Sequence, residues 1–286
     1  MSEKILIASD STTDLSPELI EKYGVKILHM GITLGDKDYT DGIDIDPDAI
    51  YDNYNKTGVL PKTAAINIAA FEDFFKEYTE QGYSIVLFTI SAEMSSTLGN
   101  ARLAADDFEN VYVVDTRNLS TGGGLLVMSA AQMAEEGKSA KEIADECTRL
   151  ADYVDASFVI DSLEFLHKGG RCSALAALGA NLLQLKPCIS VKGGKMGVGK
   201  KYRGKFAAVL PQYIADRVGD ASDINLDKVF VTHAGCDPEI VELCVNKVNE
   251  LAPEANIMIT RAGCTVSSHC GRNTLGVLFI RKNPIV

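Results

Sequence analysis

The sequence predicts an α/β protein built from two domains, an N-terminal domain over residues 1–160 and a C-terminal domain over residues 161–286. The length of 286 residues exceeds the size at which one hydrophobic core usually stops growing. β-rich runs alternate with helical patterns up to about residue 153, which is typical of a largely parallel sheet. After residue 160 a hairpin and further strands and helices indicate an α+β domain. We expect a ligand site between the two domains.

In the first domain, each β-rich run is followed by a segment with helical periodicity. The predicted strands are KILIAS, VKILHMGITL, YSIVLFTI and VYVVD. The predicted helices begin at Pro17, near Pro47, at Asn67 and at Ser95, and two more end near Tyr153. The helix starts carry capping signals, which are Ser16 before Pro17, Asp46 before Pro47, and a capping box of Ser139 and Glu142.

The second domain is expected to begin with an almost wholly apolar helix. Between residues 174 and 185, Asn181 and Gln184 alone carry hydrogen-bonding side chains, so this helix must be buried or must line an apolar cavity. Gly170 and Arg171 precede it, and a glycine turn with a cation at a helix start favours a nearby anion. A core helix with Arg171 in an ordinary ion pair explains the same pattern. The later segments predict a hairpin at Gly193–Gly194, helices at 205–218 and 238–251, and the strands KVFVTHA, ANIMITRA and LGVLFIRK.

Charge and composition exclude several classes of protein. The net charge of -11 argues against nucleic-acid binding and against adhesion to anionic membranes. No apolar run approaches the roughly 18 residues of a membrane-spanning helix, and residues 1–4 lead directly into a strand, so we expect no signal peptide and no stable membrane insertion. The seven cysteines have no metal-binding spacing, which predicts reduced thiols in a cytoplasmic protein.

Three motifs approach known ligand-binding patterns but depart from them at a decisive position. GGKMGVGKK has the spacing of a phosphate-binding loop, but Lys201 stands where a hydroxyl must hold magnesium. Residues 122–124 are three glycines without the spacing of a dinucleotide site, which favours tight helix packing. The six aspartates between residues 35 and 48 lack the glycine position and the final glutamate of a calcium loop, which favours a solvated acidic loop. We expect no cofactor and no metal.

Polar side chains that could recognise a carboxylate lie in three separate segments. They are Thr63 in PKTAAIN, Ser91, Ser95, Ser96 and Thr97 in ISAEMSSTLGNA, and His269 in CTVSSHCGRNTLG. Helix capping explains each hydroxyl equally well. Together with Arg171, they form a possible set of donors around one carboxylate. Cys270 beside His269 suggests a nucleophilic pair, but neighbours on an extended chain point to opposite faces.

In this order, the motifs resemble those of the DegV family of bacterial proteins from one end of the chain to the other. The matching segments are SDSTTDL, the turns with Thr63 and with Ser95 and Thr97, VVDTRNLSTGGG, LEFLHKGGR with LLQLKP, the glycine hairpin leading to YRGK, and SSHCG with LGVLFIRK. The resemblance implies a two-domain fold with one long-chain fatty acid between the domains. Some members of the family are the binding subunit of bacterial fatty acid kinase and present the carboxylate to a separate subunit that carries ATP.

By position, the resemblance also implies a role for individual residues. Thr63, Ser95 and His269 would bind the carboxylate, and Arg171 would support that end of the pocket. Further ligand contacts could come from Ser91, Ser96, Thr97 and Gly170. We expect the apolar tunnel to include Ile66, Leu178 and Leu182. Arg203 in YRGK would face the kinase.

The chain departs from the family pattern at three points. Ala92–Glu93 replaces a common Ser-Gly pair, Ser96 replaces a common glycine, and Arg272–Asn273 replaces a common Pro-Gly pair.

Two rival interpretations remain. The first rival is a stand-alone phosphotransferase or hydrolase of a small anionic substrate that uses His269 or Cys270. The second is an interaction module whose apolar helix is ordinary core.

Overall fold

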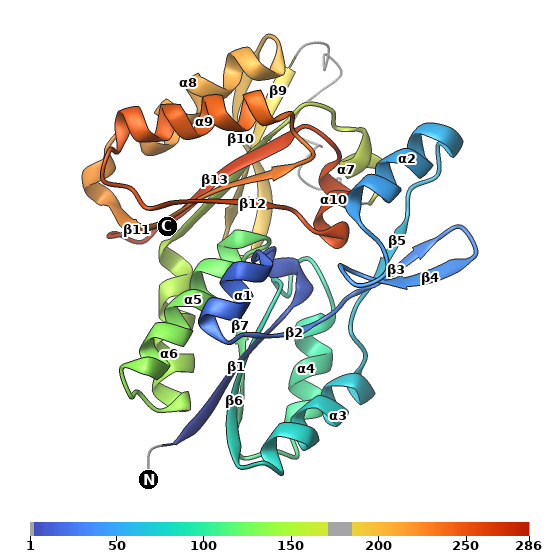
Figure 1. Cartoon of the computed structure of the whole chain (residues 1–286), viewed down its shortest axis with the longest axis vertical. Helices are drawn as coiled ribbons and strands as arrows, with labels where there is room; N and C mark the ends of the chain where they lie inside the picture. The colour runs from blue at the N-terminus through green and yellow to red at the C-terminus, as the bar shows by residue number, and fades with distance from the viewer. Residues whose placement is uncertain (1–2, 171–184, 286) are drawn as a thin grey trace.

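The computed structural model describes residues 3–170 and 185–285. Within these residues the chain forms three β-sheets. Figure 1 shows a larger sheet with its helices above a smaller sheet with its own helices, and a short third sheet that projects to one side. The predicted class, a largely parallel α/β unit followed by an α+β unit, is confirmed.

The first sheet is wholly parallel, with the strand order β2-β1-β6-β7. Its strands are β1 (Lys4–Asp10), β2 (Lys26–Leu28), β6 (Tyr83–Thr89) and β7 (Val111–Asp115). Its helices are α1 (Pro17–Tyr23), α3 (Ile68–Thr79), α4 (Thr97–Ala105), α5 (Thr121–Glu135) and α6 (Ala140–Leu150). Successive residues of β6 point to opposite faces, so Ile85 and Leu87 meet α3 and α4 whereas Val86 and Phe88 meet α5 and α6. Burial on both faces explains why the strands are continuous apolar runs.

The capping signals act as the sequence predicted. The hydroxyl of Ser16 accepts a hydrogen bond from the backbone N–H of Leu19, and the carboxylate of Asp46 accepts one from Ala49 at the start of α2 (Pro47–Thr57). Ser139 and Glu142 form a complete capping box at the start of α6. Each capping residue satisfies a backbone donor that the helix leaves free.

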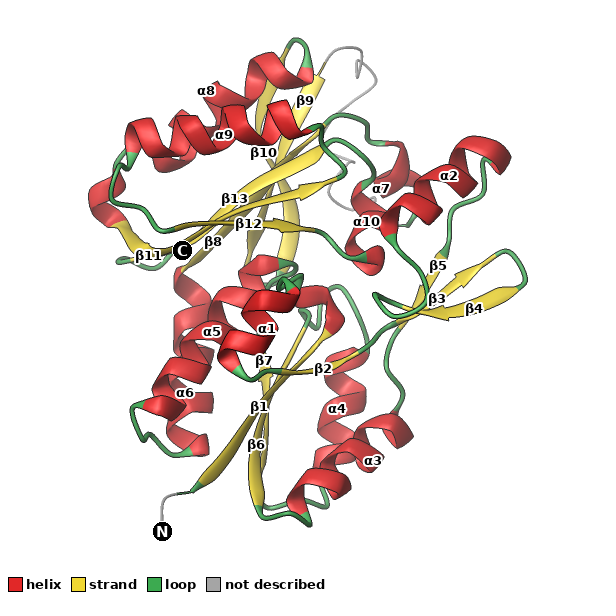
Figure 2. Cartoon of the chain, in the orientation of Figure 1, coloured by secondary structure: helices red, strands yellow, loops and turns green. Residues whose placement is uncertain are grey.

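The second sheet is mixed and has the order β10-β9-β8-β13-β11-β12. Its strands are β8 (Val154–Ile160), β9 (Leu185–Lys192), β10 (Lys195–Arg203), β11 (Ile224–Ala234), β12 (Ile257–Arg261) and β13 (Thr274–Arg281). Figure 2 shows α8 (Phe206–Val218) and α9 (Pro238–Leu251) on one face of this sheet. Because β8 pairs with β9 and β13, the second sheet begins at residue 154, a few residues before the predicted domain boundary.

Helix α5 joins the two large sheets into one core. Its apolar residues share a cluster with Val86 and Phe88 of the first sheet and with Phe230 and Leu278 of the second. The three glycines near its start permit this approach, since a Cβ at Gly124 would lie 2.8 Å from Leu15 Cδ2. The tight packing predicted for this motif is therefore confirmed.

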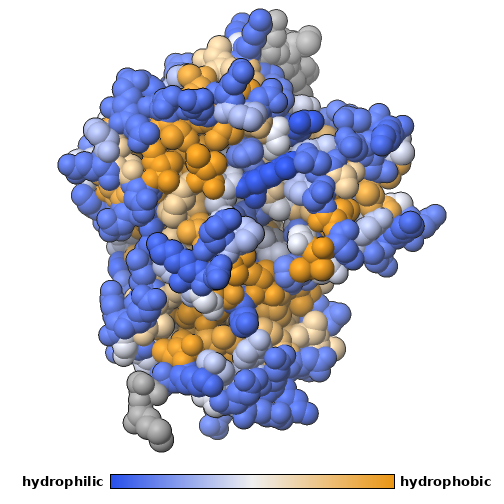
Figure 3. All heavy atoms as spheres, viewed as in Figure 1, coloured by the Kyte–Doolittle hydropathy of each residue, from blue (hydrophilic) through white to orange (hydrophobic). Residues whose placement is uncertain are grey.

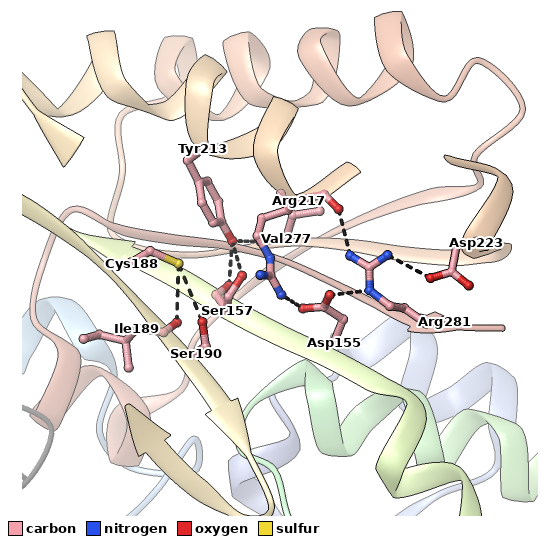
Figure 4. Close-up of polar contacts among 10 residues, drawn as sticks. All are labelled: Asp155, Ser157, Cys188, Ile189, Ser190, Tyr213, Arg217, Asp223, Val277 and Arg281. Carbon is pink, nitrogen blue, oxygen red and sulfur yellow. Dashed lines mark hydrogen bonds and ion pairs between the residues drawn. The ribbon is translucent and has the colours of Figure 1, made fainter. Parts of the chain in front are cut away.

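An ionic network fixes α8 to the second sheet (Figure 4). The buried carboxylate of Asp155 on β8 accepts hydrogen bonds from Arg217 of α8 and from Arg281 of β13. Nearby, the hydroxyl of Tyr213 donates to the Ser157 carbonyl at 2.7 Å and accepts from the Val277 N–H at 3.0 Å. Buried charge is stable here because each partner is opposite in sign and hydrogen-bonded.

The third sheet, antiparallel and of order β4-β3-β5, forms a side unit with short helices. Its parts are β3 (Gly31–Leu34), β4 (Lys37–Thr40), β5 (Lys62–Ala64), α2, α7 (Glu164–Lys168) and α10 (Cys264–Cys270). The segment VKILHMGITL, predicted as one strand, is divided between β2 and β3, because the chain leaves the parallel sheet where the Met30 N–H donates to Ser11 Oγ. On the side of the molecule drawn in Figure 3, the rim is mostly hydrophilic, whereas apolar residues appear in the middle.

Candidate ligand site between the sheets

A cavity of about 190 Å³ lies beside the carboxyl ends of the parallel strands and under the second sheet. Open α/β sheets commonly bind ligands at this edge. Most of its wall is apolar. The lining residues are Met30, Thr63, Ala65, Ile90, Met94, Ser95, Ser96, Leu119, Phe158, Leu166, Met196, Thr265, Val266, His269 and Cys270.

The cavity wall includes the three residues expected to bind a carboxylate. Thr63 Oγ1 on β5 lies 3.0 Å from His269 Nε2 on α10, although the two residues are 206 positions apart in the chain. Ser95 lines the same cavity, and its Oγ lies 2.8 Å from Thr97 Oγ1. The cavity therefore combines hydroxyl and imidazole groups with an apolar wall, which suits an amphiphilic molecule.

The other hydroxyls of the predicted set lie in different environments. Ser96 lines the cavity, whereas Thr97 is buried beside it and bonds to Ser95 and to Met30 Sδ. Ser91 is also buried, and its hydroxyl donates to the Gly194 carbonyl at 2.8 Å, which ties the loop after β6 to the β9–β10 hairpin. Ser91 and Thr97 thus support the loop, and their hydroxyls are engaged by protein atoms.

Of the other residues predicted for the ligand site or the kinase-facing surface, the structure describes Ile66, Gly170 and Arg203. Ile66 packs with Phe71 and Phe75 in the core of the first sheet and is not among the described residues that line the cavity. Gly170 is exposed just after α7, and Arg203 is exposed at the end of β10. Arg171, Leu178, Leu182 and nearly all of the predicted apolar helix lie outside the described residues. Leu185, predicted as the last residue of that helix, is instead the first residue of β9.

The segment that carries His269 and Cys270 is a helix, α10, and not the extended chain that we predicted. Its first N–H groups are held by two buried aspartates: Gly263 N–H donates to Asp14 Oδ1, and Cys264 N–H donates to Asp41 Oδ1, both at 2.8 Å. Thr265 also donates to Asp41 through its N–H and its hydroxyl. Carboxyl oxygens at a helix start accept hydrogen bonds from its free donors.

Sequence reasoning missed the role of both aspartates. Asp41 belongs to the acidic run that we predicted to be a solvated loop, yet it is 2% exposed. Asp14 is the second aspartate of the SDSTTDL motif and adopts φ 50, a left-handed conformation that Asp tolerates better than most residues. The available signal was the regular position of SDSTTDL directly after the first strand, but its partners on α10 are more than 200 residues away.

Small residues fix the orientation of the His269 ring. A Cβ at Gly169 would lie 2.7 Å from His269 Nδ1, so the glycine allows α7 to pack directly against the imidazole. Gly271, at φ 75, has Phe165 Cγ 2.8 Å from the position of its missing Cβ. The imidazole is held between Thr63 on one side and Gly169 on the other.

Burial shifts the pKa of two aspartates behind the site. Desolvation raises the pKa of Asp14 to about 8, against the opposing effect of hydrogen bonds from Ser120 and Gly263. Desolvation likewise raises the pKa of Asp10 to about 6. The folded protein therefore holds these protons more tightly than the unfolded chain, whose reference value is 3.8.

This shift predicts that stability falls as pH rises. Between the unfolded pKa and the folded value of about 8, the folded state retains a proton on Asp14 that the unfolded state has lost. The free energy of unfolding should decrease by up to about 1.4 kcal/mol per pH unit for each such proton. Between about pH 6 and pH 8 Asp14 dominates, because Asp10 has already titrated. Urea unfolding at several pH values measures the slope.

Asp14→Asn is the matched variant for this prediction. The amide has the same shape but does not titrate, so the slope between about pH 6 and pH 8 should become shallower than in the wild type. Equal slopes in the two proteins would show that Asp14 is not the group responsible.

Cys270 lines the cavity but is poorly suited to nucleophilic chemistry. The residue is 5% exposed, and desolvation raises the pKa of its thiol to about 12. The thiolate is the reactive form, so at neutral pH this cysteine is almost wholly protonated. The six cysteines in the described part of the chain are all buried and free of disulfides.

Among the described residues, no cluster of histidine, cysteine, aspartate and glutamate could hold a metal ion. Nor does any helix in those ranges combine the length and the apolar character needed to cross a membrane.

Together, the fold and the cavity define a mixed α/β protein with a mostly apolar cavity between its two larger sheets, whose wall also carries hydroxyl and imidazole groups. The chain belongs to the DegV family, since the family described as "Uncharacterised protein, DegV family" matches residues 4–282. It is 32% identical to a DegV domain-containing protein of Clostridium acetobutylicum over 282 residues, which cover 98% of this chain and 99% of the relative. A DegV domain-containing protein of Clostridium perfringens is 35% identical over 287 residues, which cover 98% of this chain and 99% of the relative.

Solved structures share the fold over nearly the whole chain. A DegV family protein of Thermus thermophilus, described with fatty acid binding, has a TM-score of 0.90 at 27% identity and covers 97% of this chain and 99% of its own. A protein of Eubacterium ventriosum, described as binding stearic acid, has a TM-score of 0.85 at 27% identity and covers 97% of this chain and 98% of its own.

Proposed function

We propose that this protein binds one long-chain fatty acid in the cavity between its sheets. The carboxylate is held by Thr63, Ser95 and His269, with Arg171 in support, and the acyl chain follows the apolar wall. The observation that carries the proposal is the 3.0 Å contact between Thr63 and His269 in the wall of a mostly apolar cavity. Relatives with this fold that are described as binding fatty acids support the same ligand.

The energetics favour such a ligand. A chain of about 16 carbons contributes on the order of 12 kcal/mol of gross transfer energy, before the costs of ordering are subtracted. A buried carboxylate without partners would cost several kcal/mol. The hydroxyls of Thr63 and Ser95 and the imidazole of His269 provide hydrogen bonds that offset this cost.

Mass spectrometry of gently purified protein tests the proposal. Under native conditions we expect an adduct with the mass of a fatty acid, which should be lost on delipidation and restored by adding hexadecanoic acid. The matched control is delipidated protein with hexadecanol, which has the same chain without the carboxylate and should bind more weakly. Absence of a native adduct, together with no binding by delipidated protein, would refute the proposal.

We also propose that the bound acid is presented to a separate kinase subunit, which makes the acyl phosphate. Arg203 is exposed at the end of β10, where an anionic surface of a partner could contact it. With a cognate kinase, Arg203→Ala should lower acyl phosphate formation by about tenfold, the effect expected for one lost ion pair at an interface, and leave fatty acid affinity unchanged.

The control for Arg203 is Lys37→Ala, which removes an exposed cation from β4 on the side unit. This variant should retain wild-type transfer. If Arg203→Ala supports phosphate transfer as well as Lys37→Ala does, Arg203 does not face the kinase.

The rival function, a hydrolase or phosphotransferase acting alone, makes a different prediction. Thr63 and His269 have the spacing of a nucleophile and its general base, so turnover of a small ester or phosphate by the purified protein would be lost in His269→Ala. A wild-type protein that binds fatty acid and shows no turnover decides against this rival.

A further inference from the structure

A second, smaller chamber continues the cavity into the interior. It has a volume of about 30 Å³ and shares Leu119, Phe158, Val266 and Cys270 with the first cavity. Thr63, Ser95 and His269 line the first cavity alone. The two spaces therefore adjoin at the four shared residues, which we call the neck.

The chamber exists because small residues occupy the face of the second sheet that meets α5. In the strand register, Gly276 on β13 stands between Phe158 on β8 and Thr232 on β11. A Cβ at Gly276 would lie 2.6 Å from the Ser157 carbonyl oxygen and 3.1 Å from Phe158 Cβ, so the glycine allows the neighbouring strand to pack closely at the chamber wall. Ala234 lines the chamber two positions after Thr232, on the same face of β11. Ala156 and Ala262 add further small side chains to the wall.

The wall of the second chamber is uncharged. Thr232 Oγ1 lies 2.6 Å from Thr121 Oγ1 and 3.0 Å from Thr260 Oγ1, so protein atoms already satisfy its hydroxyl. His233 Nδ1 accepts a hydrogen bond from the Cys236 N–H, and desolvation lowers the pKa of this histidine, which favours its neutral form. Such a wall suits the methyl end of an acyl chain and offers no partner to a second polar group.

We propose that the second chamber receives the end of the acyl chain and sets the chain length that the protein prefers, with Ala234 as a specificity-determining residue. This inference rests on the proposed fatty acid binding. A short acid fills the first cavity and stops before the neck. A longer acid gains affinity by passing Phe158 and burying its last carbons against Ala234 and Gly276.

The test compares Kd values for dodecanoic and hexadecanoic acid in delipidated protein. Ala234→Leu fills the chamber, so it should weaken the binding of hexadecanoic acid relative to that of dodecanoic acid by at least about tenfold. Each methylene excluded from the chamber should raise Kd by about fourfold. Leu278→Ala enlarges the chamber and should shift the preference toward the longer acid. Ala252→Leu, a buried alanine packed on the opposite face of the sheet, is the control and should leave the ratio unchanged.

The outcomes separate this inference from the proposed function. If the wild type binds neither acid, the proposed function itself fails. If the wild type binds both acids and the ratio of their Kd values stays within about twofold of wild type in Leu278→Ala and in folded Ala234→Leu, the chamber does not set chain length. Should Ala234→Leu not fold, the ratio in Leu278→Ala decides the question.

Discussion

Replacing His269 by alanine should weaken the binding of hexadecanoic acid by about 100-fold, which corresponds to about 2.7 kcal/mol. The reason is that a buried carboxylate loses a hydrogen-bond partner, while Thr63 Oγ1 loses the imidazole nitrogen 3.0 Å away. The apolar wall is unchanged, so residual binding should come from the acyl chain alone. Isothermal titration of delipidated protein gives the affinity.

A double-mutant cycle shows whether Thr63 and His269 act as a unit. Thr63→Val keeps the shape of the side chain and removes the hydroxyl, and it should weaken binding by about tenfold. In the double variant the two losses should not add, because both residues hold the same carboxylate. Ser268→Ala is the control, since this neighbour on α10 donates to the Cys264 carbonyl and does not line the cavity. If His269→Ala binds hexadecanoic acid with wild-type affinity, the imidazole does not contact the carboxylate.

Replacing Asp41 by alanine should lower the free energy of unfolding by about 3 to 5 kcal/mol. This buried carboxylate accepts hydrogen bonds from the Cys264 and Thr265 N–H groups and from the Thr265 and Ser11 hydroxyls. Without it, these donors lose a charged acceptor and the start of α10 loses its negative partner. Urea unfolding measures the change.

Asp36→Ala is the matched control, because Asp36 is an exposed member of the same acidic run. It should change stability by no more than about 0.5 kcal/mol. Fatty acid affinity should also fall in Asp41→Ala, since α10 carries His269, although Asp41 does not line the cavity. Equal stability in the two variants would mean that α10 does not depend on Asp41.

The structure explains the departures from the family pattern in part. Glu93 is exposed and lies 3.5 Å from Lys195 at the tip of the β9–β10 hairpin, close to the Ser91 contact with Gly194. Arg272 donates to the Gly235 carbonyl from the end of α10, and it is not among the described residues that line the cavity. The guanidinium of Arg272 is therefore held by a backbone carbonyl of the β11–α9 loop.

Local signals predicted much of the fold correctly. Capping by Ser16, Asp46 and Ser139 and the glycine hairpin at Gly193–Gly194 depend on residues a few positions apart, so they can be recognised from the sequence. The helix at 264–270 was missed, because aspartates at positions 14 and 41 supply its caps. A seven-residue helix has little stability of its own, so its formation depends on those distant partners.

By itself, the sequence determined the α/β class, the order of most elements and the polar side chains that could meet a carboxylate, because hydrophobic period and turn chemistry act over short distances. Tertiary structure decided which of these side chains share a cavity: Thr63, Ser95 and His269 do, whereas Ser91 and Ile66 serve the hairpin contact and the core. It also produced the second chamber, whose wall includes Phe158, Gly276 and Thr232, which the register of three strands brings side by side. The physical reason is that a cavity is the space left between elements, and that space depends on how distant segments pack.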